Sequence, residues 1–430
     1  MTVSLNYSHL RTRLTEFRDE NNIPVTLLLL SLLLMPVFRL IIHPNSGLLT
    51  DSRFYHNYPL YIELVIIILT MAIGFKQQST IFRQSRVLWT FFFIWLVAAA
   101  VGLEQSINVG KAVIKNAEFL IHFFFALSLI DIFRKTSPTD RSYISATAII
   151  GILLFLPFFF VATFLISANS EAFNWSTDLP AFSNVRHLSF TMAIVIMLLA
   201  FARPCMEIKD GRYLYIFPVL LSACWTILFW SGGRGSILAT FSTLAICTAI
   251  FTWRSKKSWI RLNLFAIFTG AFLSILLPAP NDSYGIFRLY DDTIDSQSIN
   301  QLSASRLTIW KETTEHIIEA PWTGFGPNQT VYLVEFGDGF VIHPHNIVLQ
   351  ALLAWGVIGG IVFLGFIVTP LLSSALSLRK VKDMPPVSLA GFALALMLFV
   401  HAFVDSTLYH PFTIFYFVVG LSLAMTHRQA

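Results

Sequence analysis

Two histidines stand at an abrupt change in hydropathy and are the first candidates for chemistry. The segment His343-Pro344-His345-Asn346 closes a long polar stretch and leads directly into a long apolar one. A titratable ring at the rim of a membrane is costly unless it is used or paired. His345 is therefore a candidate general base, and a hydrogen-bonded interfacial pair is the alternative. A metal site is disfavoured because no Cys, Asp or Glu stands beside the pair at ligand spacing, although Asp338 is not far away.

The geometry expected for the two rings follows from the proline between them. A residue that precedes proline favours extended backbone, and side chains along extended backbone alternate in direction. His343 and His345 are therefore predicted to point in different directions.

Arginines form the second set of candidates. Arg234 lies in the tight turn Ser231-Gly232-Gly233-Arg234-Gly235, directly before an apolar segment. Glycines let a ligand approach the backbone, and the start of a helix presents free N–H groups. An arginine at such a position suits a phosphate or diphosphate. Arg186 and Arg306 are weaker candidates of the same kind, because an arginine at a helix end also pairs with lipid headgroups.

Three further polar residues lie near the end of the chain. His401 and His410 flank a short turn and are interpreted as structural. Asp405, between them, could face the same cleft and orient a catalytic group. A carboxylate at a helix end near water is the simpler interpretation.

Composition decides what kind of fold must hold these residues. The chain has 430 residues, of which 55% are hydrophobic and 12% are charged. Soluble domains usually carry about 25% charged residues, and apolar runs of about 20 residues recur here. The sequence therefore predicts an all-α polytopic membrane protein, with residues 1–430 forming a single integral membrane domain. About twelve transmembrane helices are expected, over residues 24–43, 58–76, 87–103, 117–133, 143–167, 186–202, 213–230, 235–253, 261–279, 347–371, 386–407 and 411–427.

Basic residues orient these spans. Every even-numbered connection and the N-terminal tail carry at least three Lys or Arg, so the positive-inside rule places both termini in the cytoplasm. The net charge of +5 then needs no nucleic-acid partner. The residues concerned are Arg11, Arg13, Arg18, Lys76, Arg83, Arg86, Arg134, Lys135, Arg141, Arg203, Lys209, Arg212, Arg254, Lys256, Lys257, Arg261, Arg379, Lys380 and Lys382.

Segment 280–346, between the ninth and tenth spans, is the one sizeable external element, and it is periplasmic in a Gram-negative cell. A helix is predicted from about Arg306 to Glu319, capped by Ser303 or Ser305 and stopped by Pro321. Its apolar positions suggest a helix that lies on the membrane or closes a cleft. Gly324-Phe325-Gly326-Pro327 is typical of a turn.

Several function classes lack their usual signals. No nucleotide-binding glycine motif and no Asp-x-Asp pair is present, and the three cysteines imply no disulfide framework. Glu63, Glu118 and Asp131 are expected toward span ends. A proton-coupled transporter would normally need a buried acid or an acid–base relay.

The histidine segment resembles the marker of the O-antigen ligase family, within the wider ligase and polymerase superfamily. His345 and Asn346 are followed by nine residues and then Gly356-Val357-Ile358-Gly359. Arg234 and Leu238 match a second marker, Arg-x-x-x-Leu. About twelve spans with one large periplasmic loop before the histidine are also similar to this family, so the resemblance covers most of the chain.

The resemblance implies transfer of a glycan from undecaprenyl diphosphate to a lipid A–core sugar, at the periplasmic face of the inner membrane. It implies no metal and no nucleotide cofactor. His345 would act as general base, with His343 in reserve and Asn346 beside the substrate. Arg234 and Arg186 would bind the diphosphate, Arg306 would bind the diphosphate or an acceptor phosphate, and the anomeric centre would invert.

Two other functions remain open at this point. A polymerase that joins repeat units on the same lipid carrier would use nearly the same residues, and a ligase for another polymer or a protein acceptor is a variant of it. A transporter of lipid-linked oligosaccharide belongs to a different class and would form no new glycosidic bond.

Overall fold

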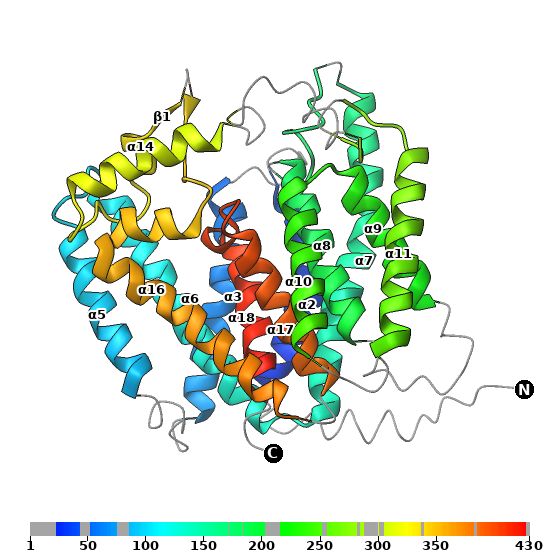
Figure 1. Ribbon diagram of the computed structural model, residues 1–430, viewed down its shortest axis with the longest axis horizontal. Helices are drawn as coiled ribbons and strands as arrows, with labels where there is room; N and C mark the ends of the chain where they lie inside the picture. Colours follow the sequence, from blue (N-terminus) through cyan, green and yellow to red (C-terminus); the bar gives the residue numbers. More distant parts are fainter. Residues whose placement is uncertain are drawn as a thin grey trace, which may run out of the picture.

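The computed structural model is a bundle of helices (Figure 1). It describes residues 23–43, 52–74, 86–170, 172–182, 184–202, 216–251, 256–281, 284–287, 300, 305–336, 339–381 and 385–426. Most of the basic connections that orient the chain, together with Cys205, Arg288, Ser303 and Asp338, lie outside these ranges.

The described helices follow one another with short connections. Their bounds are α2 Ile23–Ile42, α3 Ser52–Gly74, α5 Arg86–Gly102, α6 Val109–Lys135, α7 Pro138–Ala168, α8 Val185–Ala202, α9 Ile216–Trp230, α10 Arg234–Ile250, α11 Lys256–Leu276, α14 Arg306–Glu319, α15 Thr330–Leu333, α16 Ile347–Arg379, α17 Pro386–His401, the 3-10 turn η5 Thr407–Tyr409 and α18 Pro411–Met425. Two short strands, β1 Glu335–Phe336 and β2 Gly339–Phe340, pair antiparallel between α15 and α16.

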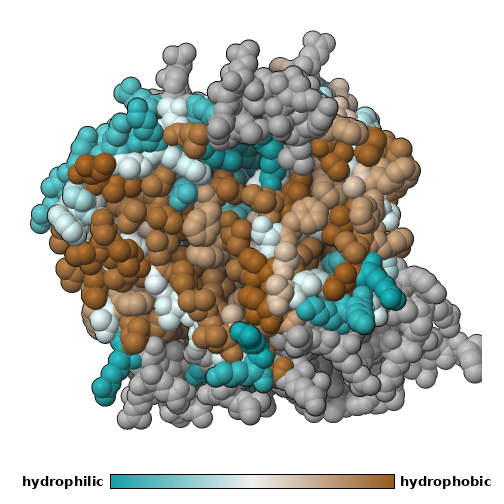
Figure 2. All heavy atoms as spheres, viewed as in Figure 1, coloured by the Kyte–Doolittle hydropathy of each residue, from teal (hydrophilic) through white to brown (hydrophobic). Residues whose placement is uncertain are grey.

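Each of the twelve predicted apolar ranges overlaps one of these helices. Five helices are long and apolar enough to cross a membrane, and six shorter apolar helices accompany them. Figure 2 shows a broad hydrophobic band across the middle of this face, with hydrophilic residues gathered above it. The chain is therefore a multi-pass helical membrane protein. The count of twelve crossings stays a prediction, as does the assignment of segment 280–346 to the periplasm.

The centre of the bundle is formed by helices that are apolar on every side. Helix α17 packs against α18, α8 and α10, and α17 and α18 are buried along most of their length. Glycines let α17 and α18 approach closely, because a Cβ atom on Gly391 would lie 2.5 Å from the carbonyl oxygen of Gly420. By contrast, α11 at the edge of the bundle (Figure 1) exposes large apolar side chains such as Phe268, as a lipid-facing helix would.

A break in α16 was not expected from its sequence. Gly356 has φ 65° and ψ −176°, which interrupts the helix after its first two to three turns. The loop after α14 fills the break. The backbone N–H groups of Phe325 and Gly326 donate to the carbonyl oxygens of Leu353 and Ala354 at 2.8 and 2.9 Å, and that of Val357 donates to the oxygen of Pro321 at 2.7 Å. The predicted Gly-Phe-Gly-Pro turn is therefore a docking element.

Glu63 does not lie toward a span end. It is the twelfth of the 23 residues of α3 and is fully buried, so that expectation was wrong. The helix begins at Ser52, inside a stretch that the hydropathy pattern assigns to a polar connection, and this moves Glu63 to mid-helix. Its carboxylate contacts the Nδ1 atom of His122 on α6 at 2.7 Å.

Candidate functional site

His345 is held by Asp405 at the end of the bundle where α16 begins. The Nδ1 atom of His345 lies 2.9 Å from Oδ1 of Asp405, and both side chains are partly exposed. Asp405 is placed by the turn between α17 and η5. Because a carboxylate at Nδ1 accepts a proton from that nitrogen, the ring presents Nε2 with a free lone pair. This is the tautomer that a general base requires.

His343 and His345 do not point in different directions. Their ring centroids lie 4.4 Å apart with the planes at 88°. His345 has φ 52°, in the left-handed region, so the segment is not extended at that residue. The extended-backbone prediction was therefore wrong.

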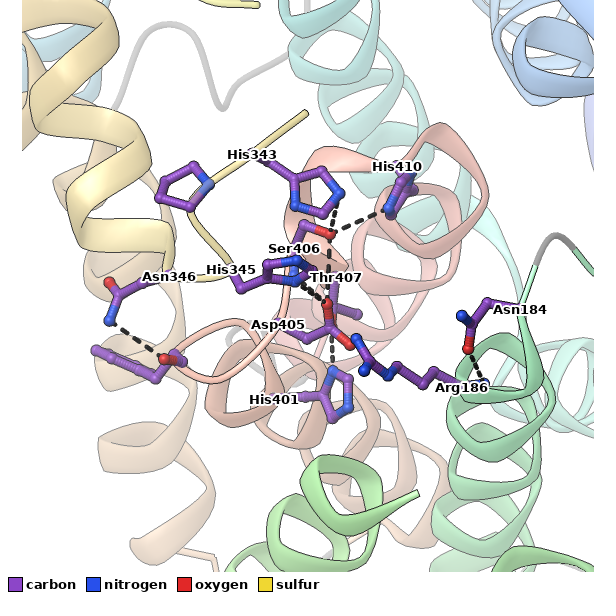
Figure 3. Close-up of polar contacts among 12 residues, drawn as sticks. Asn184, Arg186, His343, His345, Asn346, His401, Asp405, Ser406, Thr407 and His410 are labelled. Carbon is purple, nitrogen blue, oxygen red and sulfur yellow. Dashed lines mark hydrogen bonds and ion pairs between the residues drawn. The ribbon is translucent and has the colours of Figure 1, made fainter. Parts of the chain in front are cut away.

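Ser406 ties the neighbouring histidines to the carboxylate (Figure 3). Its hydroxyl lies 2.9 Å from Nε2 of His343 and 3.1 Å from Nε2 of His410, and its backbone N–H donates to Oδ1 of Asp405 at 2.8 Å. Burial and the neighbouring His345 lower the pKa of His343 to about 3. His343 is thus neutral over the physiological range and a weaker base than its sequence position suggests.

Asp405 is ionised. Burial raises its pKa, but the hydrogen bond from His345, the charge of His401 and the Ser406 N–H outweigh burial and hold that pKa well below its usual range. The site therefore contains a fixed negative charge beside the candidate base.

Three arginines from three helices line one pocket. Arg186 comes from the first turn of α8, Arg234 from the start of α10 and Arg306 from the start of α14. The pocket contains about 390 Å³ of empty space and is also lined by Gly232, Gly233, Gly235, Ser236, His401 and Asp405. Burial, with repulsion from Arg186 and Arg234, lowers the pKa of Arg306, while Asp405 opposes the shift. This is a pocket for an anionic group.

The arginine pocket and the histidine meet at Asp405. A second, smaller pocket of about 180 Å³ is lined by His345, Asn346, Ile347, Gln350, Asp405, Ser406, Leu408 and Tyr409. Asp405 lines both pockets, and Figure 3 shows the Arg186 side chain extending toward the Asp405 carboxylate. The residues singled out by sequence thus lie in two adjoining pockets that share one carboxylate.

Asn346 serves the backbone. Its Oδ1 atom accepts from the N–H groups of Val348 and Leu349, capping α16, and its Nδ2 atom donates to the Phe403 oxygen at 3.2 Å. These bonds fix the residue that follows His345. Substrate contact by Asn346 stays a prediction.

Helix α14 has the bounds predicted for it and braces the histidine segment. The Nε1–H group of Trp310 donates to the carbonyl oxygen of Pro344 at 2.8 Å. Ser305 precedes the helix with φ 60° and makes no side-chain capping bond. Because α14 carries both Arg306 and Trp310, it joins the two pockets mechanically.

His401 has structural partners, as its sequence position suggested. Its Nε2 atom lies 3.0 Å from the Ser236 hydroxyl, and its Nδ1 atom contacts the Thr407 hydroxyl. Among the described residues, no group of three or more His, Cys, Asp or Glu side chains has the arrangement to hold a metal ion.

The fold and the site define a multi-pass membrane protein with a cationic pocket beside a carboxylate-bound histidine. Residues 218–364 match the family model described as O-Antigen ligase. This stretch includes Arg234, Arg306, His345 and both marker glycines, and the match confirms that the chain belongs to the O-antigen ligase family. The comparison with curated proteins finds no match.

Proposed function

We propose that the protein is an O-antigen ligase: a glycosyltransferase that moves a glycan from undecaprenyl diphosphate to a sugar of lipid A–core, without a metal or a nucleotide. The observation that carries the proposal is the sharing of Asp405 by a three-arginine pocket and a pocket that holds His345. One pocket suits an anionic leaving group and the other suits a proton acceptor. The family match supports the same class of substrate, a lipid-linked glycan.

The base and its orienting carboxylate act on the acceptor. Nε2 of His345 takes the proton from the acceptor hydroxyl as its oxygen attacks the anomeric carbon. Asp405 holds Nδ1 at 2.9 Å and stabilises the imidazolium that forms. A positioned base of this kind contributes about 10²–10⁴-fold in rate.

The arginines act on the leaving group. As the bond between the anomeric carbon and the phosphate oxygen breaks, that oxygen keeps the electron pair and the diphosphate gains negative charge. Arg186, Arg234 and Arg306 surround the pocket where this charge develops. Fixed cations stabilise such charge without reorganisation of solvent. Attack from the face opposite the diphosphate inverts the anomeric centre.

Glycan transfer by purified protein tests the proposal. Protein in nanodiscs is given a carrier-linked glycan with and without lipid A–core, and the products are separated by gel and analysed for anomeric configuration. His345→Ala and Arg234→Ala are each expected to reduce transfer by about 10²-fold or more. Lys311→Ala, on the exposed face of α14, is the control and should leave transfer intact. Wild-type transfer by His345→Ala, or retained configuration, would contradict the mechanism.

A polymerase that extends the glycan on its own carrier is the nearest alternative, because only the acceptor differs. The same assay separates the two. Carrier-linked chains that lengthen in the absence of lipid A–core favour the polymerase, whereas product that appears only with lipid A–core favours the ligase.

A transporter of lipid-linked oligosaccharide gains one specific observation. The buried pair Glu63–His122 is the kind of intramembrane acid and base that proton-coupled transporters use. This function predicts movement of lipid-linked sugar across liposomes with no new glycosidic bond. Movement that survives in His345→Ala and is lost in Glu63→Gln would favour it.

A further inference from the structure

An apolar pocket opens between two helix pairs, next to the candidate site. Helix α5 packs against α16, and α6 packs against α18. The space between the pairs holds about 700 Å³ and is lined almost entirely by hydrocarbon side chains. Leu408 lines this apolar pocket and also the pocket of His345 and Asp405. The hydrocarbon space therefore begins where the candidate site ends.

One polar side chain faces the hydrocarbon. His122 lines the apolar pocket and is 4% exposed. Its Nδ1 atom pairs with Glu63 at 2.7 Å, and Glu63 is 0% exposed. The Nε2 atom of His122 is buried and has no hydrogen-bond partner in the part of the chain that the structure describes. An unsatisfied polar atom among apolar side chains is unfavourable by about 1–3 kcal/mol.

The chemistry of that nitrogen selects among lipid chains. A polyisoprenoid chain carries no hydrogen-bonding group, so it would leave Nε2 unsatisfied. A hydroxyl group on an acyl chain satisfies either state of the ring: it donates to a bare Nε2, or it accepts from Nε2–H. An acyl chain that bears a hydroxyl near its head group therefore fits the pocket better than the chain of the donor.

The depth of His122 agrees with such a chain. The ammonium of Lys115 on α6 donates to the backbone oxygen of Tyr409 at 2.8 Å, next to Leu408. His122 follows Lys115 by seven residues, or ~10 Å along the helix. A chain that enters beside Leu408 reaches His122 in the first part of its length.

Aromatic rings narrow the pocket to the width of a chain. The ring of Phe123 on α6 stacks on Phe92 of α5 at 4.7 Å and packs against Phe366 of α16 at 5.6 Å. Ala126, one turn further along α6, is the smallest residue of the lining. A larger side chain at Ala126 would fill the space.

We infer that this apolar pocket binds a hydroxylated acyl chain of the acceptor lipid, with His122 recognising the hydroxyl and Glu63 orienting His122. The inference rests on the proposed function, since it assigns this side of the site to the acceptor. The arginine side is then left to the donor. Both lipids thus approach Asp405 from different sides.

Binding of two matched probes tests the inference. The probes are a glucosamine 1-phosphate N-acylated with a 3-hydroxytetradecanoyl chain and the same molecule with a tetradecanoyl chain. Native mass spectrometry of the full chain in detergent measures the affinity for each. Wild-type protein is expected to prefer the hydroxylated probe by roughly threefold to fifteenfold, the effect of one intramembrane hydrogen bond.

Variants locate the preference. Glu63→Leu combined with His122→Phe removes both members of the pair, so that no buried charge is left alone, and should abolish the preference while chain binding persists. Ala126→Phe should weaken binding of both probes. Ser128→Ala and Leu127→Phe, on the same helix but outside the lining, are the controls and should behave as wild type.

Each outcome is decisive. Equal affinity of wild-type protein for the two probes overturns the inference, as does displacement of the hydroxylated probe by a polyisoprenyl phosphate that Ala126→Phe no longer binds. Glycan transfer is measured separately. Intact transfer without chain preference removes only this inference, whereas preference without transfer supports the pocket and contradicts the proposed function.

Discussion

At the scale of single residues, Asp405 is the group through which the two halves of the site act together. It lies between His345 and the three arginines, and its position in both pockets follows from one short turn. A neutral isostere at this residue keeps the shape and removes the charge. Its effect therefore separates electrostatic orientation from packing.

Asp405→Asn is expected to lower kcat of glycan transfer by about 10²–10⁴-fold with a smaller change in KM, because the amide does not stabilise the protonated ring of His345. The acid limb of the pH–rate profile should move to lower pH for the same reason. Steady-state kinetics from pH 5 to 9 measures both, with Glu315→Gln, an exposed carboxylate on α14, as control. An unchanged profile would reduce Asp405 to a packing role.

His343 is expected to make the protein less stable in acid. Its pKa is lowered to about 3 in the folded state, against about 6.5 in an unfolded chain. Between these values the unfolded chain binds the proton and the folded one does not, so stability rises with pH across this window and falls as pH drops through it. Each unit is worth up to about 1.4 kcal/mol.

Thermal unfolding in detergent from pH 7.5 to 4.5 checks this prediction. His343→Gln keeps a partner for Ser406 and should flatten the decline in Tm by the share of this one residue. A decline as steep in His343→Gln as in wild type would assign the acid sensitivity to other groups.

The candidate site was partly predictable. Residue type and position beside apolar segments sufficed to select Arg186, Arg234, Arg306 and His345, which now line adjoining pockets. Asp405 was noticed but not chosen, because 60 residues separate it from His345 and hydropathy does not say which helix ends meet. The close packing of His343 on His345 was missed because a left-handed φ at a histidine leaves no mark in the sequence.

At the scale of elements, the break in α16 explains why both marker glycines are needed. At Gly356 the backbone has φ 65°, and a Cβ atom would lie 2.5 Å from the carbonyl carbon and oxygen of Trp322. At Gly359 a Cβ atom would lie 2.5 Å from that of Ala98 on α5. The first glycine admits the loop after α14, and the second lets α5 approach α16.

Gly356→Ala is therefore expected to destabilise the protein by about 2–5 kcal/mol, through backbone strain and the clash with Trp322. Glycan transfer should fall with it, because the loop positions α14. Gly110→Ala is the matched control, since its Cβ atom would meet only an ordinary contact at 3.5 Å. Equal Tm values for the two variants would contradict this account.

Sequence alone predicted the bounds of α14 because capping serine, amphipathic period and terminating proline all agree there. The break in α16 could not be predicted, because a glycine in an apolar run is common in membrane helices and its partner loop lies 30 residues upstream. The depth of Glu63 was wrong for a related reason. Polar residues at the start of α3 hide a helical turn from a hydropathy criterion.

At the scale of the whole molecule, the arrangement separates two polar ends by an apolar band (Figure 2). The basic connections predict that the end with His345 faces outward. Single cysteines test this orientation. Ile318 is 70% exposed at the His345 end, and Lys380 is exposed at the far end of α16.

In a background with Cys205 replaced by serine, Ile318→Cys is expected to react with a membrane-impermeant maleimide in intact spheroplasts. Lys380→Cys should react only after permeabilisation. Cys224 and Cys247 are buried and should stay unlabelled in both. Labelling of Lys380→Cys in intact cells would reverse the orientation and move the site to the cytoplasm.

The two attachments of α14 to α16 determine which parts of the site can shift relative to each other. Trp310 holds Pro344 on one side of the start of α16, and the loop after α14 grips the break on the other. Two anchors on one helix make a strut, so α14 travels with α16 and Arg306 travels with His345. Any widening of the arginine pocket is consequently a displacement of Arg306 away from Arg186 and Arg234, and spectroscopic labels that report it belong across α14 and α10.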